Sequence, residues 1–282
     1  MKKHKYELTN ETITIDNGKT LYRIRALIDI EEFGVKIGDL GGYIEKEYNL
    51  SHDCNAWVSD NAMVYGDARI YDNAIVYGDA RIYNYARIYG NAIISGNAMI
   101  YGNAWVSDNS MVYGDAKIYG YARIYGNATI SGNAWVSGNA WVSGNAWVYD
   151  DTKIYGNAKI YGNAIISGNA LAYDNAMIYG NAMVYGGAMV YGDAMVYGDA
   201  KIYGNADIKK VTHILMIGPI GSRNDTITFF RAKENIIKVK CGCFYGTIDE
   251  FLTKVELTHE NNKHGRAYRL AVELAKAQIE LD

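Results

Sequence analysis

Histidines are the residues of this sequence best suited to acid–base chemistry, and they are sparse. Histidine titrates near neutral pH and is the commonest general base in enzymes. The chain has 282 residues and five histidines, none of which falls between His52 and His213. His52 is therefore the only candidate catalytic base for the middle of the chain. A structural histidine in the N-terminal segment is the simpler interpretation.

A second candidate site follows the glycine-rich segment Gly218–Arg223. The segment lacks the Gly-Lys-Ser/Thr sequence of a Walker loop, so an ordinary turn is one interpretation. The other is an anion site, in which Ser222 and Arg223 donate hydrogen bonds and Arg231 lies nearby.

The cysteines offer a third candidate. Three cysteines, Cys54, Cys241 and Cys243, give no disulfide framework. Cys241 and Cys243 would share one face of a predicted strand, where His259 or His264 could join them. Metal-binding cysteines are usually separated by two or more residues. We therefore expect buried structural thiols and no metal.

A six-residue repeat occupies residues 55–206, between the candidates near the two ends of the chain. Alanine returns at every sixth residue from Ala56 to Ala206, with Ser110 and Thr152 as exceptions. A branched aliphatic follows two residues later each time, except at Ala172. A period of six fits neither an α-helix nor a long strand and predicts a solenoid. We expect the aliphatic side chain to point inward, the alanine to fill the corner, and the Gly/Asp-Asn/Asp pair to form the turn.

The segments that flank the repeat predict two end domains. Residues 1–54 predict a β cap, because two alternating runs flank an Asn17-Gly18 turn. Ile44 and Leu50 fall in the alanine register and predict an irregular first coil. Residues 207–282 predict a small α+β domain. Its expected strands are 214–217, 226–230 and 236–240, and its expected helices run from a Thr247–Glu250 capping box to about residue 257 and from about 264 to 281.

The repeat unit, as in Asn91-Ala92-Ile93-Ile94-Ser95-Gly96, resembles the hexapeptide-repeat family. The resemblance implies a left-handed parallel β-helix with triangular coils of eighteen residues. The segments 22–27, 38–45 and 49–52, followed by the repeats, look like a group of bacterial and prophage proteins labelled as hexapeptide transferases. This closer resemblance covers residues 6–206.

The family is best known for trimeric acyltransferases that use acetyl-CoA and a histidine base beside the coils. This sequence has no inserted loop and no histidine in the repeat. It also places Tyr or Ser after the inward aliphatic, where acyltransferases favour Gly, Ala, Asp or Glu. We therefore expect no cofactor and a non-catalytic scaffold. An acetyl-CoA-dependent acetyltransferase is the alternative, and His52 would be its base.

Reading every eighteenth residue sorts the outward side chains into three faces, and only the first is apolar almost throughout. An exposed apolar strip of this length usually marks an interface, so we expect a homotrimer. The predicted interface residues are Trp57, Ile75, Ile93, Met111, Trp147, Ile165 and Met183.

The net charge and the distribution of apolar residues indicate which partners and which cellular compartment to expect. A net charge of −3 gives no reason to expect nucleic acid or an anionic membrane. No stretch approaches the roughly 18 apolar residues of a membrane span, and no apolar segment follows the basic residues 1–5. We expect a cytoplasmic, prophage-encoded scaffold that binds a protein or a small anionic or nucleotide ligand and interferes with a host system.

Overall fold

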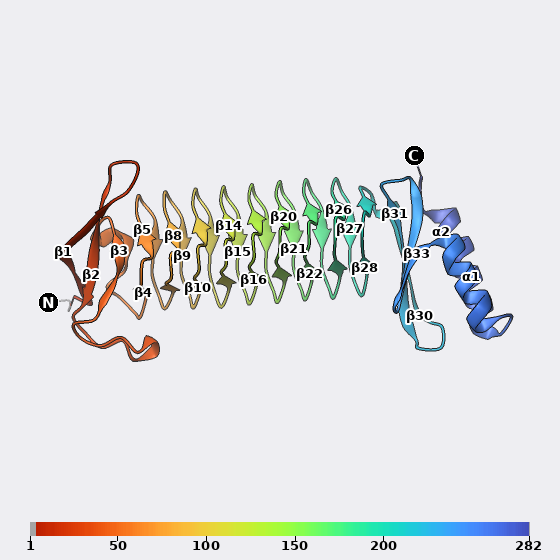
Figure 1. Ribbon diagram of the computed structural model, residues 1–282, viewed down its shortest axis with the longest axis horizontal. Helices are drawn as coiled ribbons and strands as arrows, with labels where there is room; N and C mark the ends of the chain where they lie inside the picture. Colours follow the sequence, from red (N-terminus) through yellow and green to blue (C-terminus); the bar gives the residue numbers. More distant parts are fainter. Residues whose placement is uncertain (1–3, 282) are drawn as a thin grey trace. The chain divides into compact units, whose positions relative to one another are not determined.

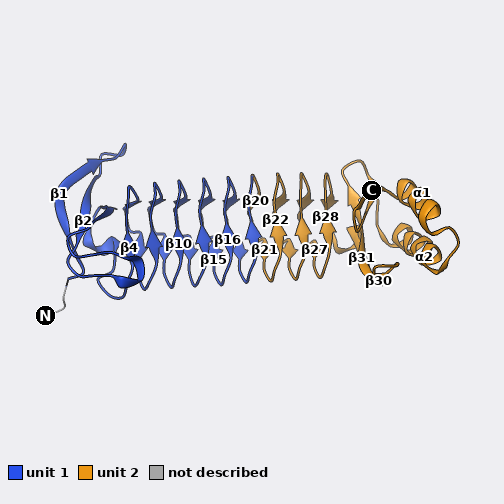
Figure 2. Cartoon of the chain, turned by 60° about the horizontal axis from the view of Figure 1, so that its bottom comes forward, with its two compact units in different colours: residues 1–150 blue, residues 151–282 orange. Residues whose placement is uncertain are grey.

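The computed structural model describes residues 4–281 and has a mainly β fold (Figure 1). A parallel β-solenoid carries an antiparallel hairpin in its N-terminal cap and a small sheet with two helices at its C-terminal end, as predicted. Two compact units make up the chain, residues 1–150 and 151–282 (Figure 2). Neither helix among the described residues has the length and apolar character of a membrane span.

Each coil follows from the chemistry of the six-residue repeat. The inward aliphatics, such as Val106, and the corner alanines, such as Ala104, are completely buried. At the corners, residues such as Gly96 (φ 65°) and Asp108 (φ 59°) adopt the left-handed conformation that glycine, asparagine and aspartate tolerate best. Stacking leaves little room there, since a Cβ on Gly90 would lie 2.7 Å from the backbone nitrogen of Asp108. The predicted roles of aliphatic, alanine and turn residues are therefore confirmed.

In the first unit the two-residue strands of successive coils pair in parallel to form three sheets. The first sheet contains β4 (Trp57–Val58), β7 (Ile75–Val76), β10 (Ile93–Ile94), β13 (Met111–Val112), β16 (Thr129–Ile130) and β19 (Trp147–Val148). The second contains β5 (Met63–Val64), β8 (Arg81–Ile82), β11 (Met99–Ile100), β14 (Lys117–Ile118) and β17 (Trp135–Val136). The third contains β6 (Arg69–Ile70), β9 (Arg87–Ile88), β12 (Trp105–Val106), β15 (Arg123–Ile124) and β18 (Trp141–Val142).

The N-terminal cap contains the predicted hairpin. Strands β1 (Tyr6–Thr14) and β2 (Thr20–Ala26) pair antiparallel, and β3 (Leu40–Ile44) joins β2 to β5. Two 3-10 turns, η1 (Glu31–Phe33) and η2 (Glu47–Asn49), complete the cap. The predicted alanine register of Ile44 and Leu50 is wrong, because they pair with the inward aliphatics Val64 and Ile70. In this irregular first coil the two aliphatics thus lie twenty residues before their partners, whereas partners in the regular coils are eighteen residues apart.

The second unit repeats the coil pattern. Its first sheet contains β22 (Ile165–Ile166), β25 (Met183–Val184) and β28 (Lys201–Ile202). Its second contains β20 (Lys153–Ile154), β23 (Leu171–Ala172), β26 (Met189–Val190) and β29 (Asp207–Ile208). Its third contains β21 (Lys159–Ile160), β24 (Met177–Ile178) and β27 (Met195–Val196).

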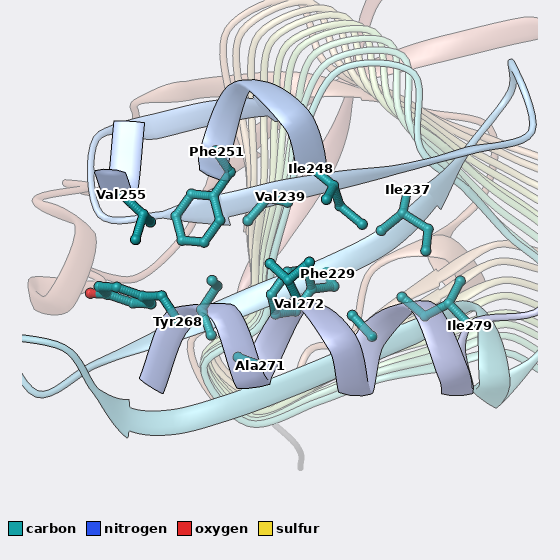
Figure 3. Packing of buried hydrophobic residues seen from close by; sticks show 12 residues of the cluster. Phe229, Ile237, Val239, Ile248, Phe251, Val255, Tyr268, Ala271, Val272 and Ile279 are labelled. Atoms are coloured by element: carbon teal, nitrogen blue, oxygen red, sulfur yellow. The ribbon is translucent and has the colours of Figure 1, made fainter. Parts of the chain in front are cut away.

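A small α+β domain follows these coils after the turn η3 (Val211–His213). Strands β30 (Ile214–Ile220), β31 (Asp225–Ala232), β32 (Ile236–Cys241) and β33 (Phe244–Thr247) form an antiparallel sheet. Helices α1 (Ile248–His259) and α2 (Lys263–Gln278) cover it, and their apolar side chains point toward one another across the buried cluster (Figure 3). The predicted capping box is present, because Thr247 Oγ1 accepts from Glu250 N and Glu250 accepts from Thr247 N. The strand β33 had no counterpart in the prediction.

Candidate functional site

A cavity with a volume of about 210 Å³ lies in the C-terminal domain of the second unit. Three parts of the domain meet there: the β30–β31 turn, the β32–β33 turn and the facing sides of α1 and α2. The lining residues are Ser222, Arg223, Asp225, Cys241, Gly242, Cys243, Phe244, Phe251, Lys254, Val255, Thr258, His259 and Tyr268.

The inner part of the cavity is apolar and largely aromatic. Phe251 of α1 packs edge-on against Tyr268 of α2, with 5.4 Å between ring centroids, and lies 5.3 Å from Phe244. Figure 3 shows Phe251, Val255 and Tyr268 at one end of the buried cluster. Ligand pockets commonly combine such an apolar wall with a few polar groups.

The polar groups at the cavity favour an anion. Arg223 and Lys254 both line it, and neither forms an ion pair with a carboxylate among residues 4–281. Ser222 adds a hydroxyl. Asp225 is the one acidic lining residue, and its carboxylate lies 3.8 Å from Lys201 Nζ, outside the lining set. The cavity therefore offers two cations and a hydrogen-bond donor beside an apolar wall.

The thiols differ from the prediction. Cys241 ends β32, whereas Gly242 and Cys243 form the turn to β33, so the two thiols do not share a strand face. Cys241 is half-buried and Cys243 is exposed, which contradicts a pair of buried structural thiols. Burial raises the pKa of Cys241 and raises the pKa of Tyr268 to about 12. Both groups are therefore neutral at pH 7, and a protonated Cys241 is a poor nucleophile.

Only part of the predicted anion site comes together. Ser222 and Arg223 line the cavity, but Arg231 lies near the other end of β31, where it is buried and forms an ion pair with Asp207. Lys254 takes its place and was missed. The capping box that opens α1 could have revealed it, because positions 251, 254, 255 and 258 fall on one side of a helix that starts there.

His52 lies in the N-terminal cap. Its ring stacks on Tyr6 at 4.3 Å, and its Nδ1 accepts a hydrogen bond of 3.2 Å from the backbone nitrogen of Lys5. Burial lowers the pKa of His52, so the ring is neutral at pH 7. These contacts match the structural role that the sequence favoured.

His52 also forms a cluster with His4 and Glu47, whose possible ligand atoms lie within 4.8 Å of one another. The hydrogen bond at Nδ1 decides against a metal here. A neutral imidazole that accepts at Nδ1 carries its proton on Nε2 and has no second lone pair for a cation. The buried ammonium of Lys5 beside the cluster would also repel one.

The predicted interface residues fall on the first sheets of the two units. In the first unit Met111 is 39% and Trp147 is 54% exposed, and Ile75 and Ile93 are partly exposed. Trp57 is only 1% exposed because the cap covers it, so it does not contribute to the exposed strip. In the second unit Ile165 and Met183 are partly exposed.

Comparison with known protein families finds matches in the solenoid part of the chain. Five stretches match the model of a family described as the YdcK beta solenoid repeat, namely residues 68–84, 86–99, 94–108, 122–138 and 176–191. All five lie within the coils, so they support a repeat β-solenoid and do not extend to the cavity. No curated protein matches the chain.

Proposed function

We propose that this protein is a non-catalytic β-solenoid scaffold whose C-terminal domain binds a small anionic ligand. The observation that carries the proposal is the cavity, where Arg223 and Lys254 flank an aromatic wall. A ligand with one or two negative charges and a flat or apolar body fits this chemistry. A nucleotide or an aromatic carboxylate has both features.

The scaffold interpretation rests on the filled interior of the coils and on the contacts of His52. Buried aliphatics and alanines occupy the interior of the coils, and His52 is held in the cap by its contacts with Tyr6 and Lys5. The alternative, acyl transfer from acetyl-CoA with His52 as base, has no further observation in its favour. It predicts acetyl-CoA binding and acetyl transfer to an acceptor, and His52→Ala should abolish the transfer.

We also propose that the protein assembles as a homotrimer, packed through the first sheet of each unit. A ligand-binding scaffold of this kind suits sequestration of a signalling nucleotide or protein from a host system, which is the role that the resemblance to prophage proteins suggested. Both points are proposals for experiment.

Ligand binding is tested by a thermal-shift screen of nucleotides, CoA esters and aromatic carboxylates, followed by calorimetry on any hit. A ligand that binds only the folded state raises the melting temperature by mass action. Arg223→Ala and Lys254→Ala should each weaken a hit at least tenfold and leave unliganded stability within about 0.5 kcal/mol, as expected of exposed side chains.

Arg266→Ala is the matched control, because Arg266 lies on the same domain outside the lining set. A panel without a single hit, or equal losses in Arg223→Ala and Arg266→Ala, would contradict the cavity as the ligand site. Acetyl transfer from acetyl-CoA that is lost in His52→Ala would favour the transferase instead.

A further inference from the structure

An unusual strip of side chains lies on the third sheet of the first unit, far in sequence from the C-terminal cavity. Its outward positions are Arg69, Arg87, Trp105, Arg123 and Trp141, which we call the Arg–Trp strip. The guanidiniums of Arg87 and Arg123 lie 5.3 and 5.1 Å from the Trp105 ring centroid, and Arg123 lies 5.4 Å from that of Trp141. The tryptophans thus hold Arg87 and Arg123 in place, whereas the Arg69 guanidinium lies 4.4 Å from the Tyr48 ring centroid.

These arginines are cations without an internal anion. Among residues 4–281, no carboxylate forms an ion pair with Arg69, Arg87 or Arg123. Arg69 and Arg87 are direct partners in adjacent strands, an arrangement that costs stability because like charges face each other. A bound anion would remove this repulsion, so the strip is complementary to negative charge.

Two tyrosines beside the strip break the pattern of the repeat. The residue before each corner alanine is asparagine or aspartate throughout the first unit except at Tyr85 and Tyr121. Both belong to the same pentapeptide, Tyr-Ala-Arg-Ile-Tyr, at residues 85–89 and 121–125. The two copies are two coils apart, or about 9–10 Å at the usual strand spacing.

Tyr85 and Tyr121 also differ in their packing from the tyrosines of the stacked rows. Rows such as Tyr65, Tyr83 and Tyr101 stack ring on ring at about 5 Å. Tyr85 and Tyr121 have no ring partner among the described residues and are 59% and 62% exposed. Their free faces can therefore stack against another planar group.

The two tyrosines and the two arginines surround one hollow of about 230 Å³. Its lining consists of Tyr85, Arg87, Asn103, Trp105, Tyr121 and Arg123, with no acidic member. A neighbouring hollow on the other side of Trp105 includes Asp108, whose Oδ2 accepts from the backbone nitrogen of Gly126 at 2.9 Å. The acid-free hollow is the better anion site.

We propose that the Arg–Trp strip with Tyr85 and Tyr121 binds a short segment of single-stranded nucleic acid. Bases stack on the free tyrosine rings, and the phosphates between them contact Arg87 and Arg123. Sites for single strands combine stacking aromatics with a row of cations in this way. The duplication of the Tyr–Arg unit along the coils fits a polymer better than an isolated small molecule. The net charge of −3 does not oppose this, because the positive charge is local.

The test is fluorescence anisotropy with a labelled 12-nucleotide single strand of mixed sequence, as DNA and as RNA, at low and moderate salt. The double change Tyr85→Asn and Tyr121→Asn restores the repeat residue and should keep the fold. It is expected to weaken binding at least tenfold, because each stacked base contributes a large part of the affinity. The double change Arg87→Met and Arg123→Met should weaken binding and reduce the salt slope by about 0.7 for each phosphate that is no longer neutralised.

The matched control is Tyr77→Ser with Tyr113→Ser, two exposed tyrosines on the first face where the repeat also places serine. It should bind as the parent does, with circular dichroism unchanged in all variants. Parent protein that does not bind, or a control that is weakened as much as the Tyr85 and Tyr121 variant, would overturn the proposal. So would binding abolished only in Arg223→Ala, or heparin or polyglutamate binding in preference to the oligonucleotides.

Discussion

Arg231 Nη1 lies 2.7 Å from Asp207 Oδ2, and this ion pair links β31 of the C-terminal sheet to β29 in the last coil. Both side chains are nearly buried, at 9% and 12% exposure. The position that looked like part of an anion site thus fastens the end domain to the solenoid, with both partners supplied by the chain itself.

Removing one partner of this pair should be costly. Arg231→Met leaves the Asp207 carboxylate buried without its cation and should lower the free energy of unfolding by about 3 kcal/mol or more. Arg231→Met combined with Asp207→Val removes both charges and should recover most of the loss. Urea denaturation measures both values. A double variant as unstable as the single one would show that the pair does more than neutralise Asp207.

A charge inside the coils should be worse than the same charge outside. Val106 is completely buried, so Val106→Asp places an unpaired carboxylate in the apolar interior and should cost several kcal/mol. Arg81→Asp puts the same side chain on an exposed outward position and should cost about 0.5 kcal/mol or less. Equal melting temperatures for the two variants would refute the inward register.

The proposed trimer is tested on its apolar strip. Ile93→Lys with Ile165→Lys adds charge to the first sheet of each unit and should give folded monomers, because burying an unpaired ammonium at an interface is unfavourable. Met99→Lys with Met177→Lys makes the same change on other sheets and should leave the assembly intact. Light scattering gives the mass and circular dichroism the fold. A monomeric parent protein would end the proposal.

Lys5 should make stability depend on pH. It is completely buried, and its ammonium donates hydrogen bonds to the carbonyl oxygens of Ala56 at 2.6 Å and Cys54 at 3.3 Å. Burial lowers the pKa of Lys5 to about 8. Between pH 8 and the ordinary lysine pKa, the unfolded chain holds a proton that the folded chain has released, so stability rises with pH.

The effect is isolated by comparison with Lys5→Met. The stability of the parent relative to this variant should rise by about 1 kcal/mol from pH 7 to pH 9, given about 1.4 kcal/mol for each unit of pKa difference. The test uses only the change with pH, so any difference in stability between the two proteins at pH 7 does not affect it. Parallel curves across this range would mean that Lys5 titrates normally.

Periodic and local signals made most of the fold predictable from sequence. The inward Val and Ile, the Asn17-Gly18 hairpin and the Thr247–Glu250 capping box depend on neighbours within a few residues or on strict repetition. The misplaced register of Ile44 and Leu50 has a different origin. The correct register of these two residues depends on the path of the backbone between the cap and the first coils, and the strict repeat begins only at residue 55.

The candidate sites were less predictable because they depend on tertiary contacts. Ser222 and Arg223 were found by composition, but nothing local distinguishes Arg231, which pairs across to the last coil, from a residue of the cavity. Trp57 resembles the other outward residues in sequence and is buried only because the cap folds over it. The exceptional Tyr85 and Tyr121 were visible in the sequence, but their unstacked rings were not.

The corner asparagines have a consequence for how such a chain can change its length. Asn91 donates from Nδ2 to Oδ1 of Asn109 at 2.9 Å, and Asn109 donates in the same way to Asn127 at 3.1 Å. Each of these links joins residues eighteen apart, so the ladder continues wherever the same corner of the next coil also carries asparagine or aspartate. Insertion or deletion of eighteen residues therefore leaves all three sheets and their side-chain ladders in phase. A change of six residues keeps every aliphatic inside but moves each later side chain to the next face, which would rewrite the outer surface without disturbing the interior.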